Sequence, residues 1–174
     1  MTAACAPRAS GPEIGTSDRP SGGIPSRKPD DAGVRDAAAV LPADYRTTFT
    51  KLTKSRFVSQ GHAFGRWDVD VYANELAQKA LASKSKDVPV GAIVVQEHFE
   101  KAGGSTGAGN PAPGTAPGPV MLMEKKAKGF SPDHGDWRYA IIGSNGLLVK
   151  DGTIDSCAGC HDDAPADGLF SLPP

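Results

Sequence analysis

The stretch that decides the fold reads Trp67-Asp68-Val69-Asp70-Val71-Tyr72. Apolar and polar side chains alternate along it, which is the period of a half-buried β-strand. Asn74 follows as an N-cap residue, and a helix is predicted over residues 75–83. The apolar residues of this helix share one face, which predicts that it packs against a core: Leu76, Ala77, Ala80 and Leu81.

Three more segments carry strand signals. Residues 91–97 contain a short β-branched run after Pro89, which favours a strand over a helix. Residues 120–123 and 137–142 repeat the strand pattern, and Asn145-Gly146 supplies turn chemistry after the second of them. We therefore predict an α+β fold, mainly an antiparallel β-sheet with a few helices, the last of which carries two cysteines.

Composition divides the chain into a tail and one domain. Residues 1–40 contain no aromatic residue and are rich in Ala, Pro, Gly and Ser. Such a segment cannot bury enough apolar surface to offset its ordering entropy, so we predict a flexible tail or tether. A single domain is expected over residues 41–174. Inside it, residues 103–119 are almost entirely Gly, Ala, Pro, Ser and Thr, which predicts a long loop.

Charge and hydropathy argue against several classes of protein. The 174 residues include 19 basic and 20 acidic side chains, for a formal net charge of −1. No basic stripe is present, so nothing indicates nucleic-acid binding. No apolar run approaches the ~18 residues that a membrane-spanning helix needs. Three cysteines are too few for a disulfide scaffold.

Two of those cysteines lie beside a histidine, in the order Cys157-Ala158-Gly159-Cys160-His161. This is the Cys-x-x-Cys-His pattern of c-type haem attachment. On one helical turn the two thiols reach both vinyl groups of the porphyrin, and the adjacent imidazole lies under the iron. The pattern predicts one covalently bound haem c, with Cys157 and Cys160 as attachment points and His161 as the proximal ligand of the iron.

Two other interpretations of this motif stay open at this point. A structural zinc site needs four ligands, and the motif supplies at most three. A dithiol redox pair is expected at the start of a helix within a strand–helix–strand unit, and no such unit is apparent near Cys157.

With the strands and the motif in place, residues 41–174 resemble the cytochrome P-460 and cytochrome c′-beta family. The matching stretches, in chain order, are Leu41-Pro42 through Tyr45-Arg46, Val71-Tyr72-Ala73-Asn74, Gly91-Ala92 through Glu97, Met121-Leu122-Met123 before Lys125, Gly135-Asp136-Trp137, the Cys-x-x-Cys-His motif and Asp167-Gly168-Leu169-Phe170. The resemblance implies a mainly antiparallel β fold, usually a homodimer, with a five-coordinate haem c that faces the periplasm.

The family resemblance implies two branches of function. One branch oxidises hydroxylamine and has a lysine, bonded to the porphyrin, just before the glutamate of the strand at 91–97. The other binds nitric oxide and similar gases. Here Gln96 precedes Glu97, and an amide is not nucleophilic enough to form that bond. The departure argues against hydroxylamine oxidation and favours the gas-binding branch.

Several further residues are candidates for the haem pocket. Glu97 is a candidate distal proton relay, or else an ordinary strand carboxylate. Arg66 and Arg138 are candidate partners of a haem propionate, or else surface arginines. Three aromatic residues could cap the iron or fill the core: Phe64, Phe99 and Phe130.

A sixth iron ligand would make the protein an electron carrier rather than a gas binder, because it would close the open position. The candidates are Met121, Met123, His62, His98 and His134. Of the histidines, His62 in its Gly61-His62 turn is the favoured candidate. None of these is convincing from sequence alone.

Cys5 stands after Thr2-Ala3-Ala4, which resembles the end of a bacterial lipoprotein signal. The hypothesis is a lipid anchor on a flexible tether, and the alternative is an incidental thiol. Taken together, the sequence predicts a periplasm-facing cytochrome with one haem that binds a small gas such as nitric oxide. The alternatives are an oxidoreductase acting on hydroxylamine or nitric oxide, and an electron-transfer or structural subunit that docks on a membrane complex through the tail.

Overall fold

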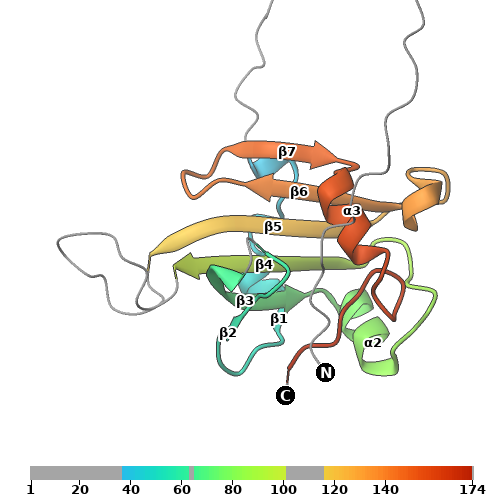
Figure 1. Ribbon diagram of the computed structural model, residues 1–174, viewed down its shortest axis with the longest axis horizontal. Helices are drawn as coiled ribbons and strands as arrows, with labels where there is room; N and C mark the ends of the chain where they lie inside the picture. Colours follow the sequence, from blue (N-terminus) through green and yellow to red (C-terminus); the bar gives the residue numbers. More distant parts are fainter. Residues whose placement is uncertain (1–36, 63–64, 101–115, 174) are drawn as a thin grey trace, which may run out of the picture.

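The computed structural model describes residues 37–62, 65–100 and 116–173. Seven strands form one antiparallel sheet in the order β1-β3-β4-β5-β6-β7, and β2 also pairs with β3 (Figure 1). The strands are β1 (Thr50–Lys51), β2 (Phe57–Val58), β3 (Trp67–Ala73), β4 (Ile93–Glu100), β5 (Pro117–Lys125), β6 (Trp137–Ile142) and β7 (Leu148–Gly152). The predicted α+β class, with its mainly antiparallel sheet and C-terminal helix, is confirmed.

The helices among the described residues are short. They are η1 (Ala37–Ala39), α1 (Tyr45–Thr48), α2 (Glu75–Ser83), η3 (Pro132–His134) and α3 (Asp155–His161). None of the helices in the described ranges is long and apolar enough to cross a membrane.

The junction of β3 and α2 forms as the sequence predicts. The Asn74 side-chain oxygen accepts hydrogen bonds from the backbone N–H groups of Ala77 at 3.0 Å and Ile93 at 3.1 Å. Its amide nitrogen donates to the carbonyl of Gly91 at 2.7 Å. One side chain therefore caps α2 and also fixes the turn into β4, which aligns β3 with β4.

The sheet separates two cores, and α3 and α1 lie on opposite faces (Figure 1). We call the side that packs against α3 the α3 face; its core includes Met123, Trp137, Tyr139, Ile154, Ala158 and Leu169. We call the opposite side the α1 face; its core consists of Tyr45, Tyr72, Val95, Leu122, Ala140 and Ile142. Because side chains alternate along a strand, adjacent residues of β4 point to different cores.

The structure differs from the predicted elements in three places. β3 is buried on both faces from Val69 to Ala73, because α1 and its neighbours cover the side on which the Asp70 carboxylate lies. β5 begins at Pro117, so residues 117–119 belong to a strand although their composition is typical of a loop. At the N-terminal end, Ala37 and Val40, which fall within the predicted tail, pack against the α1-face core.

Candidate functional site

The predicted attachment motif lies on α3, which crosses the front of the sheet in Figure 1. Ala158 is fully buried against the α3-face core and anchors the helix there. Cys160 and His161 follow Cys157 by three and four positions, so all three side chains lie along one side of the helix. All three side chains are partly buried at the edge of the core.

The thiol of Cys157 is free in this structure, and burial raises its pKa. The assignment of Cys160 as the second attachment point rests on the sequence motif.

His161 is held as an iron-binding imidazole would be. Its ring Nδ1 lies 2.7 Å from the carbonyl oxygen of Gly168, and because a carbonyl only accepts, Nδ1 carries the proton. Burial lowers the pKa of His161, which favours the neutral ring and leaves a lone pair on Nε2. Metal-binding histidines typically donate their other ring N–H to such an acceptor. The ring is flanked by Tyr139 and Phe170, with centroids 5.6 and 5.5 Å away.

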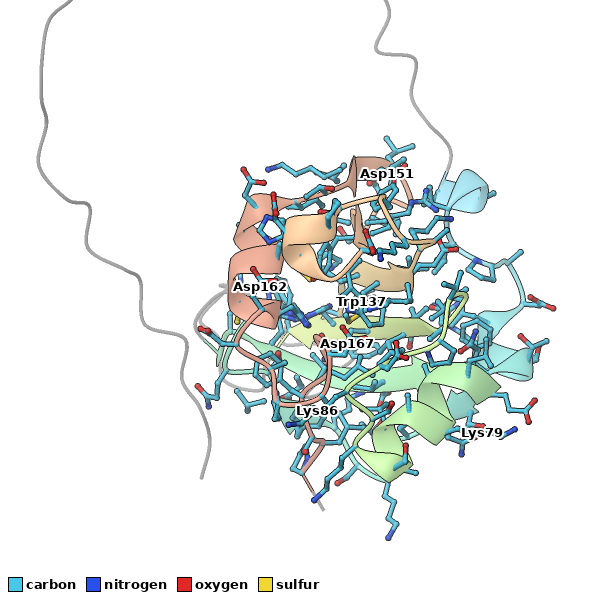
Figure 2. All side chains as sticks on the ribbon, turned by 90° about the vertical axis from the view of Figure 1, so that its right-hand side faces the viewer. Lys79, Lys86, Trp137, Asp151, Asp162 and Asp167 are labelled. Carbon is cyan, nitrogen blue, oxygen red and sulfur yellow. The ribbon has the colours of Figure 1, made fainter. Side chains whose placement is uncertain are left out.

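The acceptor of that hydrogen bond is itself fixed in place. The Asp167 carboxylate accepts from Lys125 Nζ at 2.6 Å and from the backbone N–H of Val88 at 2.8 Å. The carbonyl of Asp167 accepts from Trp137 Nε1 at 2.9 Å, and Figure 2 shows Trp137 and Asp167 next to each other. These three bonds hold the segment that carries the Gly168 carbonyl.

Gly168 is required at its position for two reasons. Its φ of +81° is in the left-handed region, and a Cβ there would lie only 2.5 Å from Trp137 Nε1. The carbonyl that orients His161 therefore depends on a glycine packed against a tryptophan. In the sequence, Asp167 and Gly168 stand out only as part of the family resemblance. The glycine seven residues after the motif histidine is the signal that could have identified this acceptor.

Two more imidazoles lie beside the motif. His62 Nδ1 and His98 Nε2 are 2.7 Å apart, and His98 Nδ1 is 2.9 Å from the carbonyl oxygen of Pro119. Burial lowers the pKa of His62 to about 3, with smaller effects in the same direction from His98 and His161. Burial also lowers the pKa of His98, against the opposing effect of the Pro119 and Gln96 carbonyls. His62, His98 and His161 are thus brought into one neighbourhood.

The residues around α3 fit a haem better than a bare metal ion. No group of three or more His, Cys, Asp and Glu side chains in the described part of the chain converges to hold such an ion, so a zinc site lacks its donor set here. Among the described residues, the buried Tyr139 hydroxyl has no hydrogen-bond partner, and burial raises its pKa. A bound porphyrin could satisfy this hydroxyl through a carboxylate substituent and the Nε2 lone pair of His161 through its iron.

The structure does not bring Glu97 together with the motif. Glu97 lies on the α1 face, where its carboxylate accepts hydrogen bonds from the Tyr45 hydroxyl and the Arg46 guanidinium. Gln96, its neighbour on β4, lies on the α3 face instead, because strand residues alternate. The carboxylate of Glu97 therefore lies on the face opposite the motif, in the setting expected of the alternative, an ordinary strand carboxylate paired with an arginine.

The predicted arginines are also engaged elsewhere. Arg138 lies on the α1 face, where Nε and Nη2 donate to Asp151 and Nη1 donates to Glu124. Arg66 is largely exposed, stacks over Trp67 and lies 3.8 Å from Glu100. Neither arginine is brought to α3 in this structure.

The remaining candidates fall into three groups. Met121 and Met123 alternate onto the α3 face, and Met123 fills its core. His134 is exposed and pairs with Asp162 at 2.8 Å, whereas Phe99 packs under Arg56 and Phe130 is exposed. Phe64 and Cys5 lie outside the described residues.

A family model described as Cytochrome P460 matches residues 42–171, which is most of the chain. A search of curated proteins gave no match. The matched range includes every strand of the sheet, α3 with its Cys-x-x-Cys-His motif, and the Asp167-Gly168 segment that orients His161. The chain belongs to the cytochrome P460 family, and this membership implies that it binds haem.

Proposed function

We propose that the chain carries one haem c, attached through Cys157 and Cys160, with His161 as its proximal iron ligand. The observation that carries this proposal is the hydrogen bond from His161 Nδ1 to the Gly168 carbonyl, one residue after a Cys-x-x-Cys pair. It fixes the tautomer in which Nε2 has a free lone pair. The structure offers no other described histidine with this relation to a pair of cysteines.

The bound haem would supply an iron that takes up a small diatomic molecule, and nitric oxide is the ligand we propose. Gln96 supports this over hydroxylamine oxidation, because it lies on the α3 face at the position of the cross-linking lysine and its amide cannot attack a porphyrin carbon. The chain's own groups would orient the cofactor. His161 is fixed by Gly168, and the buried Tyr139 hydroxyl is free to donate to a haem carboxylate.

Electron transfer is the second candidate, because His62 and His98 lie near His161. We place the protein on the periplasmic side of a bacterial membrane, where cytochromes of this kind are assembled. A lipid anchor at Cys5, a homodimer and docking of the N-terminal tail on a membrane complex are further parts of this proposal. Mass spectrometry of Cys5 and the native mass of untagged protein test them.

Covalent attachment and ligand binding are tested in two successive measurements. The intact mass of the protein, measured after denaturation and reduction, is expected to exceed the chain mass by one haem. The reduced protein is then expected to change its visible spectrum on addition of nitric oxide. A chain mass without haem would contradict the attachment, and a haem spectrum indifferent to nitric oxide would support electron transfer instead.

A further inference from the structure

His62, His98 and the carbonyl of Pro119 form a chain of hydrogen bonds. The carbonyl at its end determines which ring nitrogen of each histidine carries the proton. The carbonyl oxygen of Pro119 can only accept, so the proton of this contact lies on His98 Nδ1. The His98 side chain is 1% exposed, and no carboxylate of the described residues pairs with it. Such a ring is neutral, because burial disfavours the charged form. Its Nε2 therefore carries a lone pair.

The position of the proton on His62 follows from that on His98. The 2.7 Å contact between His62 Nδ1 and His98 Nε2 needs one proton, and His98 Nε2 has none to give. The proton therefore lies on His62 Nδ1, and His62 Nε2 is left with a lone pair. No described residue donates a hydrogen bond to that nitrogen.

His62 then has the same arrangement as His161. In both rings Nδ1 donates to an acceptor, and Nε2 is unprotonated and has no hydrogen-bond partner among the described residues. The turn that carries His62 also reaches the attachment motif, because a Cβ on Gly61 would lie 3.9 Å from the sulfur of Cys160. The turn that carries His62 therefore lies beside one of the two proposed attachment points.

We propose that Nε2 of His62 is the sixth ligand of the haem iron in the resting protein, and that His98 positions it. This inference rests on the proposed haem attachment and deepens it. A bond forms between His62 Nε2 and iron, any water in that position leaves, and no proton moves because Nε2 is already unprotonated. Nitric oxide must then displace His62, so His62 sets how readily the site opens.

The tautomer argues against the other role that a distal histidine can take. A histidine that stabilises a bound diatomic ligand donates a proton from Nε2, and here that proton lies on Nδ1 instead. His62 Nε2 therefore offers the iron a lone pair, which suits ligation.

The test uses the purified holoprotein and three variants, with absorption and electron paramagnetic resonance spectra of the oxidised state. The native protein and the control His134→Ala, which removes an exposed imidazole, are expected to be low-spin. His62→Ala is expected to be high-spin. His62→Met is expected to remain low-spin with a higher reduction potential, because a thioether replaces the imidazole. A native protein that is already high-spin, or a low-spin His62→Ala, would overturn the proposal.

Carbon monoxide binding to the reduced protein gives a second readout. In the native protein the rate is expected to level off at high carbon monoxide, because dissociation of His62 limits it. In His62→Ala the rate should rise linearly, and the apparent affinity should increase about tenfold if about a tenth of the native iron is open. Equal rates in both proteins would contradict ligation by His62. Preparations with no bound haem would instead refute the proposed attachment.

The positioning role of His98 is tested with a matched pair. His98→Leu removes the acceptor for His62 Nδ1 and is expected to produce a mixture of spin states. His98→Gln restores an amide oxygen as an acceptor and is expected to recover the low-spin spectrum. A His98→Leu protein that stays fully low-spin would show that His98 does not position the ligand.

Discussion

On the α1 face the buried carboxylates of Glu97 and Asp70 are hydrogen-bonded, whereas the α3 face includes side-chain atoms with no partner among the described residues. The contrast appears within one strand, since Glu97 faces Tyr45 and Arg46 while its neighbour His98 belongs to a chain of imidazoles that ends at an unpartnered nitrogen. Likewise, Arg138 is saturated by two carboxylates on the α1 face. Its neighbour Tyr139 has a buried hydroxyl on the α3 face that has no partner among the described residues. Because buried polar groups are normally hydrogen-bonded, this hydroxyl supports the proposed haem on the α3 face.

The two faces are expected to serve different roles, stability on the α1 face and haem binding on the α3 face. The charged side chains on the α1 face pair with other protein side chains, so their loss should lower only the free energy of unfolding. Groups on the α3 face are oriented for something bound beside α3, so their loss should change the haem as well. The following variants test this division, from the largest expected effect to the smallest.

Asp167→Ala is expected to have the largest effect. It leaves Lys125 without its partner in a pair whose side chains are only 12% and 15% exposed. Breaking a buried pair in this way typically costs about 3–5 kcal/mol. The segment that carries the Gly168 carbonyl also loses its anchor, so the visible spectrum and the reduction potential should shift. Chemical denaturation and redox titration measure both.

Asp151→Ala is the matched control on the α1 face. Arg138 keeps Glu124 as a partner in this variant, so the loss of unfolding free energy should be about 1 kcal/mol or less. The haem spectrum should not change. A spectral shift in Asp151→Ala, or none in Asp167→Ala, would break the division between the faces.

Glu97→Gln is expected to destabilise the protein without affecting the haem. Burial and the bond to Glu97 raise the pKa of Tyr45, so its hydroxyl donates to this carboxylate. Replacing the charged acceptor with an amide should lower the unfolding free energy by about 1–3 kcal/mol. The spin state and nitric oxide binding should be those of the native protein, as measured by absorption spectroscopy. Altered ligand binding would restore Glu97 as a distal residue.

Asp70 should give the α1 face an acid-sensitive stability. Burial alone would raise its pKa, but hydrogen bonds from Lys51, Arg56 and Thr53 lower it below the usual value. A carboxyl with a lowered folded pKa stabilises the protein above its unfolded pKa of about 3.9, and this contribution is lost as pH falls through the folded pKa.

The test of Asp70 compares the native protein with Asp70→Asn by denaturation between pH 7 and pH 2. The variant should be less stable at pH 7, and the difference should shrink below pH 4. Any pH effect of the haem itself appears in both proteins and cancels in the comparison. A difference that stays constant with pH would show that Asp70 is not held ionised by its partners.

His134 should show the smallest effect. The hydrogen bond to Asp162 raises the pKa of this exposed imidazole. Its contribution is present below the unfolded pKa of about 6.5 and is lost as pH rises through the folded value. A nuclear magnetic resonance titration should place its pKa above 6.5, and His134→Ala should leave the haem spectrum unchanged. A pKa below 6.5 would contradict the pairing.

Local sequence signals identified much of the fold. Strand alternation at Trp67–Ala73 and the Asn74 cap predicted β3 and α2, and the β6 strand at Trp137–Ile142 was predicted with the observed limits. Composition failed at residues 117–119, because pairing of Pro117 with Phe99 overrides their weak strand propensity. The edge strand β7 was not predicted, since its residues Leu148–Gly152 carry little apolar alternation.

Only the part of the site that lies within one short sequence motif was predictable. Cys157, Cys160 and His161 are contiguous in sequence, so their proximity needs no knowledge of the fold. The Lys125–Asp167 pair and the His62–His98 contact join residues that are 42 and 36 positions apart. The position of Glu97 on the α1 face likewise depends on the register of β4, because a one-residue step along a strand changes the face.

Covalent haem attachment at α3 is the central prediction, and one measurement tests it directly. The intact masses of the native protein and of the Cys157→Ala/Cys160→Ala double variant are compared after reduction and denaturation, with both proteins produced where haem is attached. We predict one covalent haem on the native chain and none on the double variant. A native chain without haem, or a double variant that retains it covalently, would contradict the account.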